Sequence, residues 1–595
     1  MIFKRKKYNF NFEEVIQDLN INNFASKQIF ANRIGERINS RGVYILAFLI
    51  SAVFCIFIYF GFKLQVLEYS KYLKKSDNNQ FVSVPILPTR GSILDRNGEV
   101  LAKSSKTKTK EEVSDGGYER IYTDREGFGH ILGYVNYPRK DSSGVYYQNN
   151  FEGVSGLEAY YDQLLSGRVG KILYERDAAT STINNTSFVV DFPIEGKDIK
   201  TSIDADLQEF TYKELKKFVD EKNFQGGTAI IMDIETGQIL TMTNYPEYDP
   251  KKMIPNSASP TVRNEYIKNI NVDKNFPLLN RAIAGTFAPG STMKPVFALA
   301  ALQLGLIDPV TSIFSSGKIE IPNAVDPTKT SVFRDWKAHG WVNVRTALAN
   351  SSDVFFYAVC GGFENQKGMG IGKIDEWSKA FGVDSLTGID LGGETTGNIP
   401  TPDWKEKIFK ESWRLGDTYH SAIGQYGFLL TPMGMLRMTT AIATHGNLIT
   451  PKIRVDDNPP IIKNVTVSVN EEWYNVVNDG MRMVVTQGSA KNLNSDLIEI
   501  AGKSGTAEVG VDRNHIQSWI VGWMPYKKPK YAFVFLCSMG IKNESPTPNV
   551  LARKVLEYMY TTKPELFGRP PLTATTTDLE VIATPTTQID DLQAR

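Results

Sequence analysis

The longest apolar run of the chain lies near its start. The segment VYILAFLISAVFCIFIYFGF, Val43 to Phe62, is uncharged and is bounded by Arg41 and Lys63. At about 1.5 Å per residue, a helix of about 20 residues spans the hydrocarbon core of a bilayer. A cleaved signal peptide fits less well, because the run begins only at residue 43 and no small-residue cleavage site follows it. The pattern therefore predicts a single transmembrane helix.

The residues before this run are basic. Residues 1–42 contain Lys4, Arg5, Lys6, Lys7, Lys27, Arg33, Arg37 and Arg41. Basic residues beside a first transmembrane helix favour retention on the cytoplasmic side. We therefore expect a cytoplasmic arm over 1–42, a single-pass helix over 43–62 in the cytoplasmic membrane, and an extracytoplasmic remainder.

Beyond the helix the apolar pattern breaks into short runs. Between residues 63 and 198, alternating segments such as FVSVPIL and SFVVDF are mixed with the helical pattern GLEAYYDQLLSG and are separated by glycines and polar residues. Alternation with a period of two indicates half-buried strands. We expect residues 63–198 to form an extended α/β pedestal.

A second pattern begins near residue 199. Asp204 stands where a helix N-cap belongs, before apolar residues at near-helical spacing. Two apolar strands then flank the turn ETGQ, and further strands are expected in IEIAGKSGTAEV, SWIVGWMPY and KYAFVFLCSM. Helical patterns lie between the two sets. Residues 199–566 are therefore expected to form an α+β domain whose central antiparallel sheet is flanked by helices.

Composition narrows the range of functions. The chain has 595 residues, too many for one core, and its 67 basic and 66 acidic residues leave a formal charge of +1. This balance argues against a nucleic-acid partner. Three distant cysteines and five scattered histidines show no metal-ligand spacing, so we expect no metal and no cofactor. Residues 567–595 are rich in Thr and Pro and are expected to be a disordered tail.

The stretch GTFAPGSTMKPVFALAALQLGLI holds the first candidate chemistry. Gly290 permits a sharp turn and Pro295 suits a first helical turn, so Ser291 is expected at a helix N-terminus. Lys294 follows three positions later, on the same face of a helix. It can take the hydroxyl proton only when neutral, which requires desolvation or a neighbouring cation.

Two later segments supply further candidates. In AGKSGTAEV, Lys503 offers a second cation on a predicted strand, Ser504 and Thr506 offer hydroxyls, and Gly505 leaves room for a ligand backbone. Such a strand edge can bind an extended peptide that ends in a carboxylate. In LANSSDVFFYAVC, a hydroxyl and a carboxylate, Ser351 and Asp353, alternate with Ser352 at a predicted helix start and can project into one cleft.

The order of these motifs is more specific than any one of them. S-x-x-K, then S-x-[ND] about 60 residues on, then K-[ST]-G about 150 further, is the serine acyl-enzyme signature of penicillin-binding proteins and β-lactamases. At these residues the sequence resembles a class B penicillin-binding protein. The resemblance covers most of residues 60–565, including TRGSILDRNGEVLA, HILGYV and GVSGLEAYYDQLLSGRVG in the pedestal. The segments FRDWKAHGWVNV and TGIDLGGETTGNIPTPDWK, and the aspartate in the second motif, are similar to the elongation-type branch.

The resemblance implies a D,D-transpeptidase of cell-wall synthesis that acts in elongation and cell shape. Ser291 is implied as the acylated nucleophile and Lys294 as its base. The backbone N–H groups of Ser291 and Thr506 are implied as the oxyanion hole, which stabilises a tetrahedral acyl intermediate. The substrates implied are peptidoglycan stem peptides, as D-Ala-D-Ala donor and amine acceptor. The implied partners are β-lactams and a membrane glycosyltransferase of the SEDS family.

The same resemblance assigns the remaining candidates. Ser351 and Asp353 are implied to relay a proton to the leaving amine. Lys503, Ser504 and Thr506, with the backbone at Gly505, are implied to hold the substrate carboxylate. The pedestal is implied to be a dimerisation-like domain.

Three positions depart from the family pattern. Only about fifteen residues lie between Ala102 and Tyr118, where the elongation-type branch usually inserts a larger head, so we expect a reduced head. Tyr426 follows a Gly-Gln pair where the family usually has glycine, which predicts a different loop near the cleft floor. Ser504 replaces the more common threonine and keeps the hydroxyl.

Three alternatives remain open at the level of sequence. A septal-type class B protein shares all the motifs. A β-lactamase shares the Ser-Lys chemistry but needs a base for deacylation, for which Glu394 and Glu411 are candidates. A membrane-anchored sensor or scaffold could bind β-lactams or cell-wall peptides without turnover, although the short N-terminal arm contains no recognisable effector domain.

Membrane topology gives the first testable prediction. A reporter enzyme that is active only outside the cytoplasm, fused after residue 70, should be active, because residue 70 follows the predicted helix. The same reporter fused before residue 41 should be inactive. Cytoplasmic behaviour of the fusion at residue 70 would contradict the assignment, since a cell-wall substrate lies across the membrane.

Overall fold

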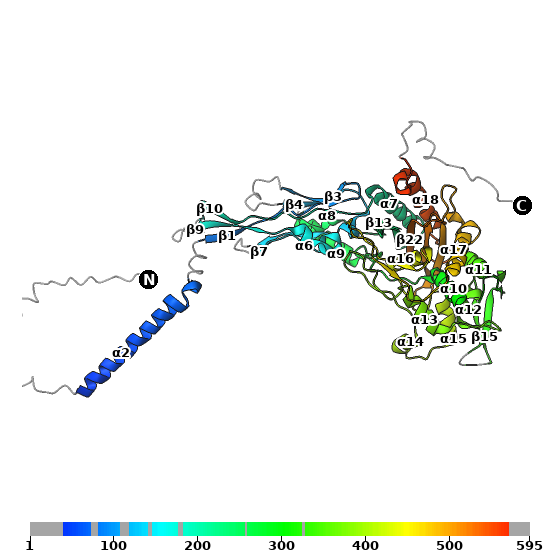
Figure 1. The fold of residues 1–595 in the computed structure, drawn as a ribbon, viewed down its shortest axis with the longest axis horizontal. Helices are drawn as coiled ribbons and strands as arrows, with labels where there is room; N and C mark the ends of the chain where they lie inside the picture. Colours follow the sequence, from blue (N-terminus) through cyan, green and yellow to red (C-terminus); the bar gives the residue numbers. More distant parts are fainter. Residues whose placement is uncertain are drawn as a thin grey trace, which may run out of the picture. The chain divides into compact units, whose positions relative to one another are not determined.

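The computed structural model describes 40–72, 81–106, 118–140, 146–176, 183–255, 259–323, 326 and 328–570. Most of the predicted arm, the centre of the predicted reduced head and all but the first residues of the predicted tail therefore lie outside the described residues. The chain divides into two units, Met1–Val84 with Ile172–Val189, and Pro85–Lys171 with Val190–Arg595. Figure 1 shows the elements of both, and each unit is described by itself.

The first unit contains the predicted apolar helix. Helix α2 (Ser40–Phe62) continues into a π-helical turn, η1 (Lys63–Leu67), and the span Arg41–Leu67 is long and apolar enough to cross a membrane. Most of its apolar side chains are exposed, as they must be in a helix that faces lipid. Most residues of a three-stranded sheet also belong to this unit; its order is β1-β9-β10, from Phe81–Ile86, Gly170–Arg176 and Ile183–Asp191.

The second unit begins with the pedestal. Its sheet has the order β11-β2-β3-β4, from Ile199–Lys200, Ile93–Leu94, Val100–Lys106 and Tyr118–Tyr122. The remaining pedestal elements are α4 (Gly129–Leu132), β5 (Val135–Asn136), β6 (Arg139–Lys140), β7 (Tyr146–Gln148), β8 (Glu152–Gly153), α5 (Gly156–Tyr160) and α6 (Asp162–Ser166). β3 and β4 pair directly up to Lys106 and Tyr118, on either side of the segment predicted to be a reduced head.

A buried ion cluster fixes the pedestal. The Glu158 carboxylate accepts hydrogen bonds from Arg90 Nε and Arg120 Nε, each at 2.6 Å, and all three side chains are almost fully buried. Arg90 and Glu158 come from two of the segments that carry the family resemblance. A buried carboxylate needs such paired donors, so these segments hold the pedestal together.

The domain expected over residues 199–566, here called the catalytic domain after its expected role, is built on one antiparallel sheet. Its order is β13-β12-β22-β21-β20, from Ile239–Tyr245, Gly226–Asp233, Tyr531–Ile541, His515–Met524 and Ala501–Val509. β12 and β13 are joined at the predicted ETGQ turn, where Gly237 has a φ of 73°. The two sets of strands expected from the sequence thus join in one sheet, with β20 at its edge.

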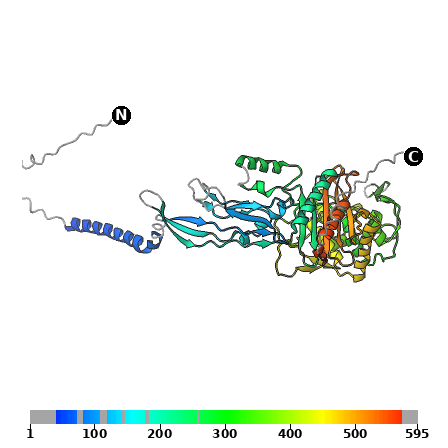
Figure 2. The same cartoon turned by 90° about the horizontal axis from the view of Figure 1, so that it is seen from above.

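Helices cover both faces of this sheet, as Figures 1 and 2 show. On one face α7 (Ala205–Glu221) and α18 (Asn549–Thr562) pack against alternate strand residues such as Ile231 and Phe533. On the other face α16 (Pro432–Ala443) packs against the intervening set, such as Ile230 and Val534. Asp204 caps α7 by accepting from Leu207 N, as predicted. The α+β fold class with a flanked antiparallel sheet is confirmed.

The predicted helical region between the strand sets contains most of the other elements. These are α8 (Pro250–Met253), α9 (Pro260–Val272), η4 (Gly290–Met293), α10 (Lys294–Gln303), β14 (Ile313–Ser315), β15 (Lys318–Pro322), β16 (Thr330–Arg334), β17 (Gly340–Val342), α11 (Val344–Asn350), α12 (Asp353–Gly361), α13 (Gly370–Ala380), α14 (Pro402–Phe409), α15 (Leu415–Ala422), β18 (Asn447–Ile449), β19 (Ile462–Asn464) and α17 (Glu471–Thr486). The short helices η5 (Lys491–Leu493) and η6 (Pro564–Phe567) complete the domain.

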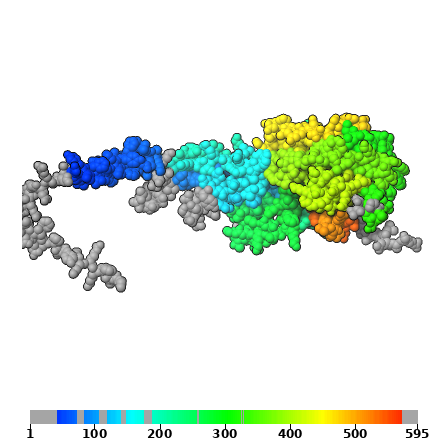
Figure 3. Space-filling view, turned by 90° about the horizontal axis from the view of Figure 1, so that it is seen from below, coloured from blue at the N-terminus to red at the C-terminus, as the bar shows by residue number. Residues whose placement is uncertain are grey.

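The pedestal part of the second unit adjoins the catalytic domain, as the space-filling view of Figure 3 shows. Tyr161 of the pedestal donates its hydroxyl to Asp390 Oδ2 at 2.6 Å, and the same carboxylate accepts from Ile453 N and Arg454 N. Asp390 belongs to the TGIDLGGETTG segment singled out in the sequence. Its structural position is therefore at the junction with the pedestal, away from the candidate catalytic residues.

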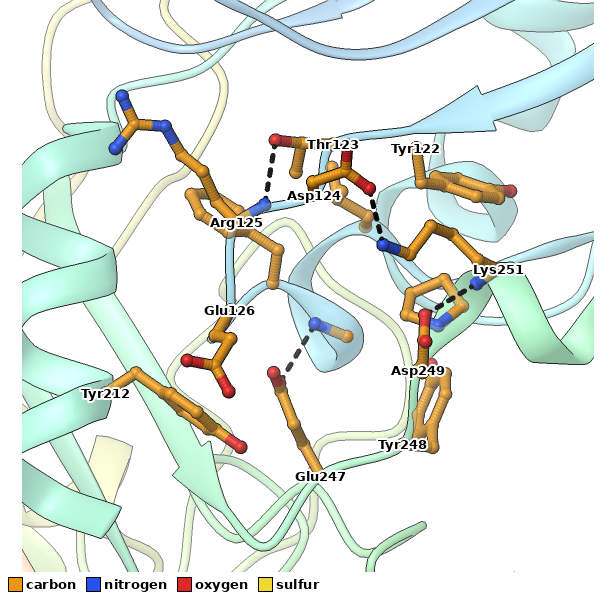
Figure 4. A pocket seen from close by; sticks show the side chains of 14 residues that line it. Tyr122, Thr123, Asp124, Arg125, Glu126, Tyr212, Glu247, Tyr248, Asp249 and Lys251 are labelled. Atoms are coloured by element: carbon orange, nitrogen blue, oxygen red, sulfur yellow. Dashed lines mark hydrogen bonds and ion pairs between the residues drawn. The ribbon is translucent and has the colours of Figure 1, made fainter. Parts of the chain in front are cut away.

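A second contact between the pedestal and the catalytic domain lies at a small cavity of about 160 Å³. Figure 4 shows Glu247 pointing toward the backbone that joins β4 to α4. Its two carboxyl oxygens accept from Gly127 N at 2.7 Å and Gly129 N at 2.9 Å. Burial raises the pKa of Glu247 to about 8, and the negative charges of Asp249 and Glu126 add to this effect. The two backbone donors oppose the increase without cancelling it.

This raised pKa predicts how stability depends on pH. Since the unfolded carboxyl ionises near pH 4.3, the stabilisation from protonated Glu247 is complete below that pH and is lost as pH rises toward about 8. Glu247→Gln cannot titrate. As pH rises from 5 to 8, the melting temperature of the wild type should therefore fall relative to that of Glu247→Gln. Thermal unfolding of both proteins in detergent measures this, and a constant difference across that range would contradict the assignment.

Candidate active site

The three predicted motifs meet in one cleft of about 440 Å³. The cleft is lined by Ser291, Trp336, Ser351, Asp353, Gln425, Ser489, Ser504, Gly505, Thr506, Glu508 and Thr547. Lys294 and Lys503 are fully buried and direct their amines to Ser351, which lines the cleft. All eight residues singled out in the sequence are therefore brought together.

Two glycines allow the segment of Ser291 to lie directly against β20. Gly290 has a φ of 56°, and a Cβ there would lie 2.7 Å from the Thr506 carbonyl oxygen. A Cβ on Gly505 would lie 2.7 Å from Thr292 Cγ2 and 2.8 Å from the Pro289 oxygen. This close approach places the backbone of Ser291 beside that of Thr506. The sharp turn at Gly290 and the first-turn position of Pro295 in α10 are confirmed.

The Lys294 amine contacts the second motif. Its Nζ donates to the Ser351 carbonyl at 2.7 Å and to Asp353 Oδ1 at 2.5 Å, and lies 3.4 Å from Ser351 Oγ. Within the part of the chain that the structure describes, no hydrogen bond joins Lys294 to Ser291. The first motif is split between η4 and α10, so the spacing of three does not place the two groups on one regular helical face.

Ser351 of the second motif contacts the lysines of the other two motifs. Its Oγ accepts from Lys503 Nζ at 2.9 Å, and its backbone, with a φ of 56°, ends α11 in the left-handed conformation. Ser352 then caps α12 by accepting from Phe355 N, so Asp353 is the first residue of that helix. The alternation of Ser351 and Asp353 around a capping Ser352 agrees with the pattern expected from the sequence.

Burial dominates the electrostatics of the cleft. It lowers the pKa of Lys503 well below the ordinary value, and the positive charge of Lys294 lowers it further, while Asp353 opposes both. Burial also raises the pKa of Asp353, against the effect of Lys294. Two buried amines thus lie near one carboxyl group, which the Lys294 amine contacts directly. Moving a proton among these groups costs less there than it does between the same groups in water, because the neutral forms need no solvation.

Sequence reasoning missed the support beneath the second motif. Asp335 Oδ2 accepts from Ser352 Oγ at 2.9 Å and from Val354 N at 3.1 Å, which anchors the start of α12. Its other oxygen lies 3.4 Å from His339 Nε2. Asp335 and His339 are part of the segment FRDWKAHGWVNV, which carried the resemblance without an assigned role.

Further lining residues were also missed. Ser489 shares a hydrogen bond of 2.8 Å with Ser504, so the hydroxyl that replaces the family's threonine is held in place. Glu508 lies two residues beyond Thr506 on β20, and the alternation of a strand could have indicated that it faces the same cleft.

Aromatic contacts hold the loop that carries Tyr426. Tyr426 has a φ of 58°, and its ring contacts those of Trp404, Trp413 and His420. Gly424, two residues earlier, packs so closely that a Cβ there would lie 2.2 Å from the Gly290 oxygen. The loop therefore supports the segment of Ser291 from below, with an aromatic cluster holding the tyrosine.

A sheet flanked by helices, with Ser-Lys, Ser-Asp and Lys-Ser-Gly motifs meeting at an edge strand, defines a serine acyl-transferase of the penicillin-binding type. Residues 227–557 match the family described as penicillin binding protein transpeptidase domain, and residues 114–201 match the penicillin-binding protein dimerisation domain. The chain belongs to the penicillin-binding protein transpeptidase family.

Curated relatives point to the same branch as the resemblance. A protein named peptidoglycan D,D-transpeptidase MrdA from Haemophilus influenzae is 28% identical, over 84% of this chain and 88% of its own length. The protein of the same name from Escherichia coli K12 is 27% identical, over 84% of this chain and 90% of its own length. The predicted elongation-type class B assignment is confirmed.

Solved structures share the fold. Penicillin-binding protein 2 of Helicobacter pylori, in complex with MreC, has a TM-score of 0.65 at 26% identity and covers 81% of this chain and 99% of its own. Penicillin-binding protein 2 of Pseudomonas aeruginosa has a TM-score of 0.61 at 28% identity and covers 80% of this chain and 96% of its own. A chain from a peptidoglycan synthase complex has a TM-score of 0.66 at 26% identity, over 87% of this chain and 97% of its own.

Proposed function

We propose that this protein is a peptidoglycan D,D-transpeptidase that cross-links stem peptides through a serine acyl-enzyme during cell elongation. The observation that carries the proposal is the convergence of Ser291, the two buried lysines and the hydroxyl row of β20 in one cleft. The names of the relatives support the same activity.

Acylation begins with attack of Ser291 Oγ on the carbonyl of the penultimate D-alanine. The carboxylate of the terminal D-alanine is held by Ser504 and Thr506, with Lys503 beneath them. The backbone N–H groups of Ser291 and Thr506, which the close approach of η4 and β20 brings together, stabilise the oxyanion. The terminal D-alanine leaves as an amine.

The proton of Ser291 passes to Lys294 in its neutral form. Asp353 and Ser351, both in contact with the Lys294 amine, provide the route by which that amine becomes neutral and by which the leaving amine is protonated. When it is protonated, Lys503, which also contacts Ser351, favours the same neutral form of Lys294. The acceptor amine of a second stem peptide then attacks the acyl-enzyme, and the groups act in reverse order.

The relatives support the choice of partners, and the sequence supports the membrane topology. The complexes with MreC and within a peptidoglycan synthase support a comparable assembly for this chain, with a SEDS-family glycosyltransferase as the polymerising partner. The apolar helix fits a single-pass anchor. We place the N-terminal arm in the cytoplasm and the catalytic domain outside, on the basis of the flanking charges.

The nucleophile gives a direct prediction. Ser291→Ala should abolish covalent labelling by a fluorescent penicillin, because Ser291 is the proposed nucleophile and its own backbone N–H belongs to the proposed oxyanion hole. The melting temperature should change little, since a partly exposed serine at a helix start contributes about 1 kcal/mol or less. Wild-type label should persist for the duration of the assay, whereas release within seconds would indicate a β-lactamase.

The charge arrangement predicts opposite shifts in the pH dependence of acylation. Lys503→Ala removes a cation beside Lys294 and should move the acidic limb of the profile to higher pH. Asp353→Asn removes the carboxylate that favours the protonated amine and should move it to lower pH. Lys294→Arg should be inactive, because a guanidinium keeps its proton at working pH.

Pre-steady-state acylation rates against pH measure all three variants. Shifts in the same direction for Lys503→Ala and Asp353→Asn would contradict the neutral-lysine mechanism. Substantial acylation in Lys294→Arg would show that Lys294 acts only as a fixed cation.

A further inference from the structure

A second groove, of about 530 Å³, lies in the same domain as the catalytic cleft and shares no lining residue with it. Strands β14, β15 and β17, helix α12 and the loop of residues 363–366 contribute side chains to this groove, here called the β14 groove. Helix α12 packs against β14 and against β16, the partner of β15. The walls of the groove therefore belong to one packed lobe of the domain. The proposed reaction uses none of these side chains.

Two exposed aromatic side chains line the β14 groove. Phe314 and Trp341 are directly opposite each other in the β14–β17 pair, and their ring centroids are 5.4 Å apart. The exposed fraction is 55% for Phe314 and 72% for Trp341. Large aromatic side chains that gather on the surface beside a concavity are typical of a binding site.

A well-ordered polar loop lines another part of the groove. Phe363 and Gln366 exchange two backbone hydrogen bonds, at 3.0 and 2.9 Å, and the Gln366 side chain donates to the Leu306 oxygen at 3.1 Å. Glu364 and Asn365, between the two bonded residues, are exposed and line the groove. The loop therefore presents a carboxylate and a primary amide to a ligand from a fixed backbone.

The charges of the groove favour a ligand without charge. Lys318 and Glu320 both line it and form an ion pair at 2.6 Å. Glu364 is the remaining charged residue of the lining, so the groove carries a formal charge of −1. A negative groove repels a polyanion such as a phosphate-linked polymer. A neutral ligand, by contrast, enters without the cost of desolvating an ion.

A neutral sugar polymer matches these features. One face of a pyranose ring consists of C–H groups that pack on an aromatic ring, while the hydroxyl groups at its edge bind amides and carboxylates. An acetamido substituent adds a methyl group for the aromatic side chains and an amide that can pair with the Asn365 amide.

The position of the groove supports the same class of ligand. Ala358 of α12 lines the groove, and Asp353, the first residue of α12, lines the catalytic cleft. The helix rises about 7.5 Å over these five residues. A peptide of about five residues spans about 17 Å when it is extended. A glycan strand in the groove can therefore keep the stem peptide attached to it at the cleft.

We propose that the β14 groove binds the glycan strand to which the stem peptide is attached, a neutral polymer of N-acetylated amino sugars. Phe314 and Trp341 pack against sugar rings, and Glu364 and Asn365 bind hydroxyl and acetamido groups. The groove holds the polymer while the cleft acts on the peptide. This role rests on the proposed function, whereas the binding itself can be measured without any reaction.

The first test measures sugar binding to the detergent-solubilised full chain by isothermal titration calorimetry. The wild type should bind chitotetraose, an uncharged β-linked tetramer of N-acetylglucosamine, more tightly than maltotetraose, a glucose tetramer without acetamido groups. Trp341→Ala and Phe314→Ala should each weaken chitotetraose binding by about fivefold, because each removes one aromatic surface. Asn365→Ala should reduce the preference for chitotetraose over maltotetraose.

The matched control is Phe276→Ala. Phe276 is 58% exposed, close to the value for Phe314, and does not line the groove. This variant should keep the wild-type affinity for chitotetraose. Absence of chitotetraose binding by the wild type, or unchanged affinity in both Trp341→Ala and Phe314→Ala, would overturn the proposal. Tighter binding of an uncharged alanine tetrapeptide than of chitotetraose would assign the groove to a protein segment and would overturn it as well.

The second test compares two donors in acylation, a free stem pentapeptide and the same peptide attached to a tetrasaccharide of the cell-wall glycan. The wild type should be acylated faster by the glycan-linked donor. Trp341→Ala should lose this advantage and Phe276→Ala should keep it. Equal rates for the two donors in the wild type would overturn the role of the groove in the reaction. Failure of the proposed function is distinct, because benzylpenicillin, which carries no sugar, would then not acylate the wild type, whereas chitotetraose would still bind.

Discussion

The structure depends on holding two buried lysine amines close to one carboxyl group. Lys294 and Lys503 are fully buried, and both reach Ser351, while Asp353 contacts Lys294 at 2.5 Å. The two ammonium groups repel each other when both are charged, and burial disfavours the charged form of every group. Such a cluster persists only because the elements around it fix each group and satisfy it with hydrogen bonds. The same penalty makes an uncharged amine accessible for proton transfer.

The fold supplies that restraint from several sides. β20 carries Lys503 at a sheet edge, and glycines at positions 290 and 505 let η4 lie against the strand. Trp519 of the neighbouring strand donates to the Ala288 oxygen and holds the segment that leads into η4. Asp335 fixes the start of α12 and therefore the position of Asp353. Each restraint acts on backbone or on a cap, so the reacting side chains are placed without occupying the cleft.

Sequence reasoning could predict what local spacing determines. The apolar run of α2, the cap of α7 at Asp204 and the strands around Gly237 follow from periodicity and turn chemistry, and the structure agrees with them. The contact of Lys294 with Asp353 depends on where α10 and α12 meet, which no local pattern encodes. Asp335 was missed for the same reason: its hydrogen bonds to Ser352 and Val354 reach 17 and 19 residues along the chain.

The charged side chains in and beside the cleft differ in how exposed they are to solvent. The lysine amines that take part in proton transfer are buried, where the neutral form of an amine is favoured. The charges of Glu508 and Lys542 are about one-third exposed, so water solvates them and separating them costs little. A buried pair could not separate in this way, because separating it would leave two unsolvated charges. Lys503 and Glu508 lie on one strand, and the cost of their charges differs because Lys503 is buried and Glu508 is partly exposed.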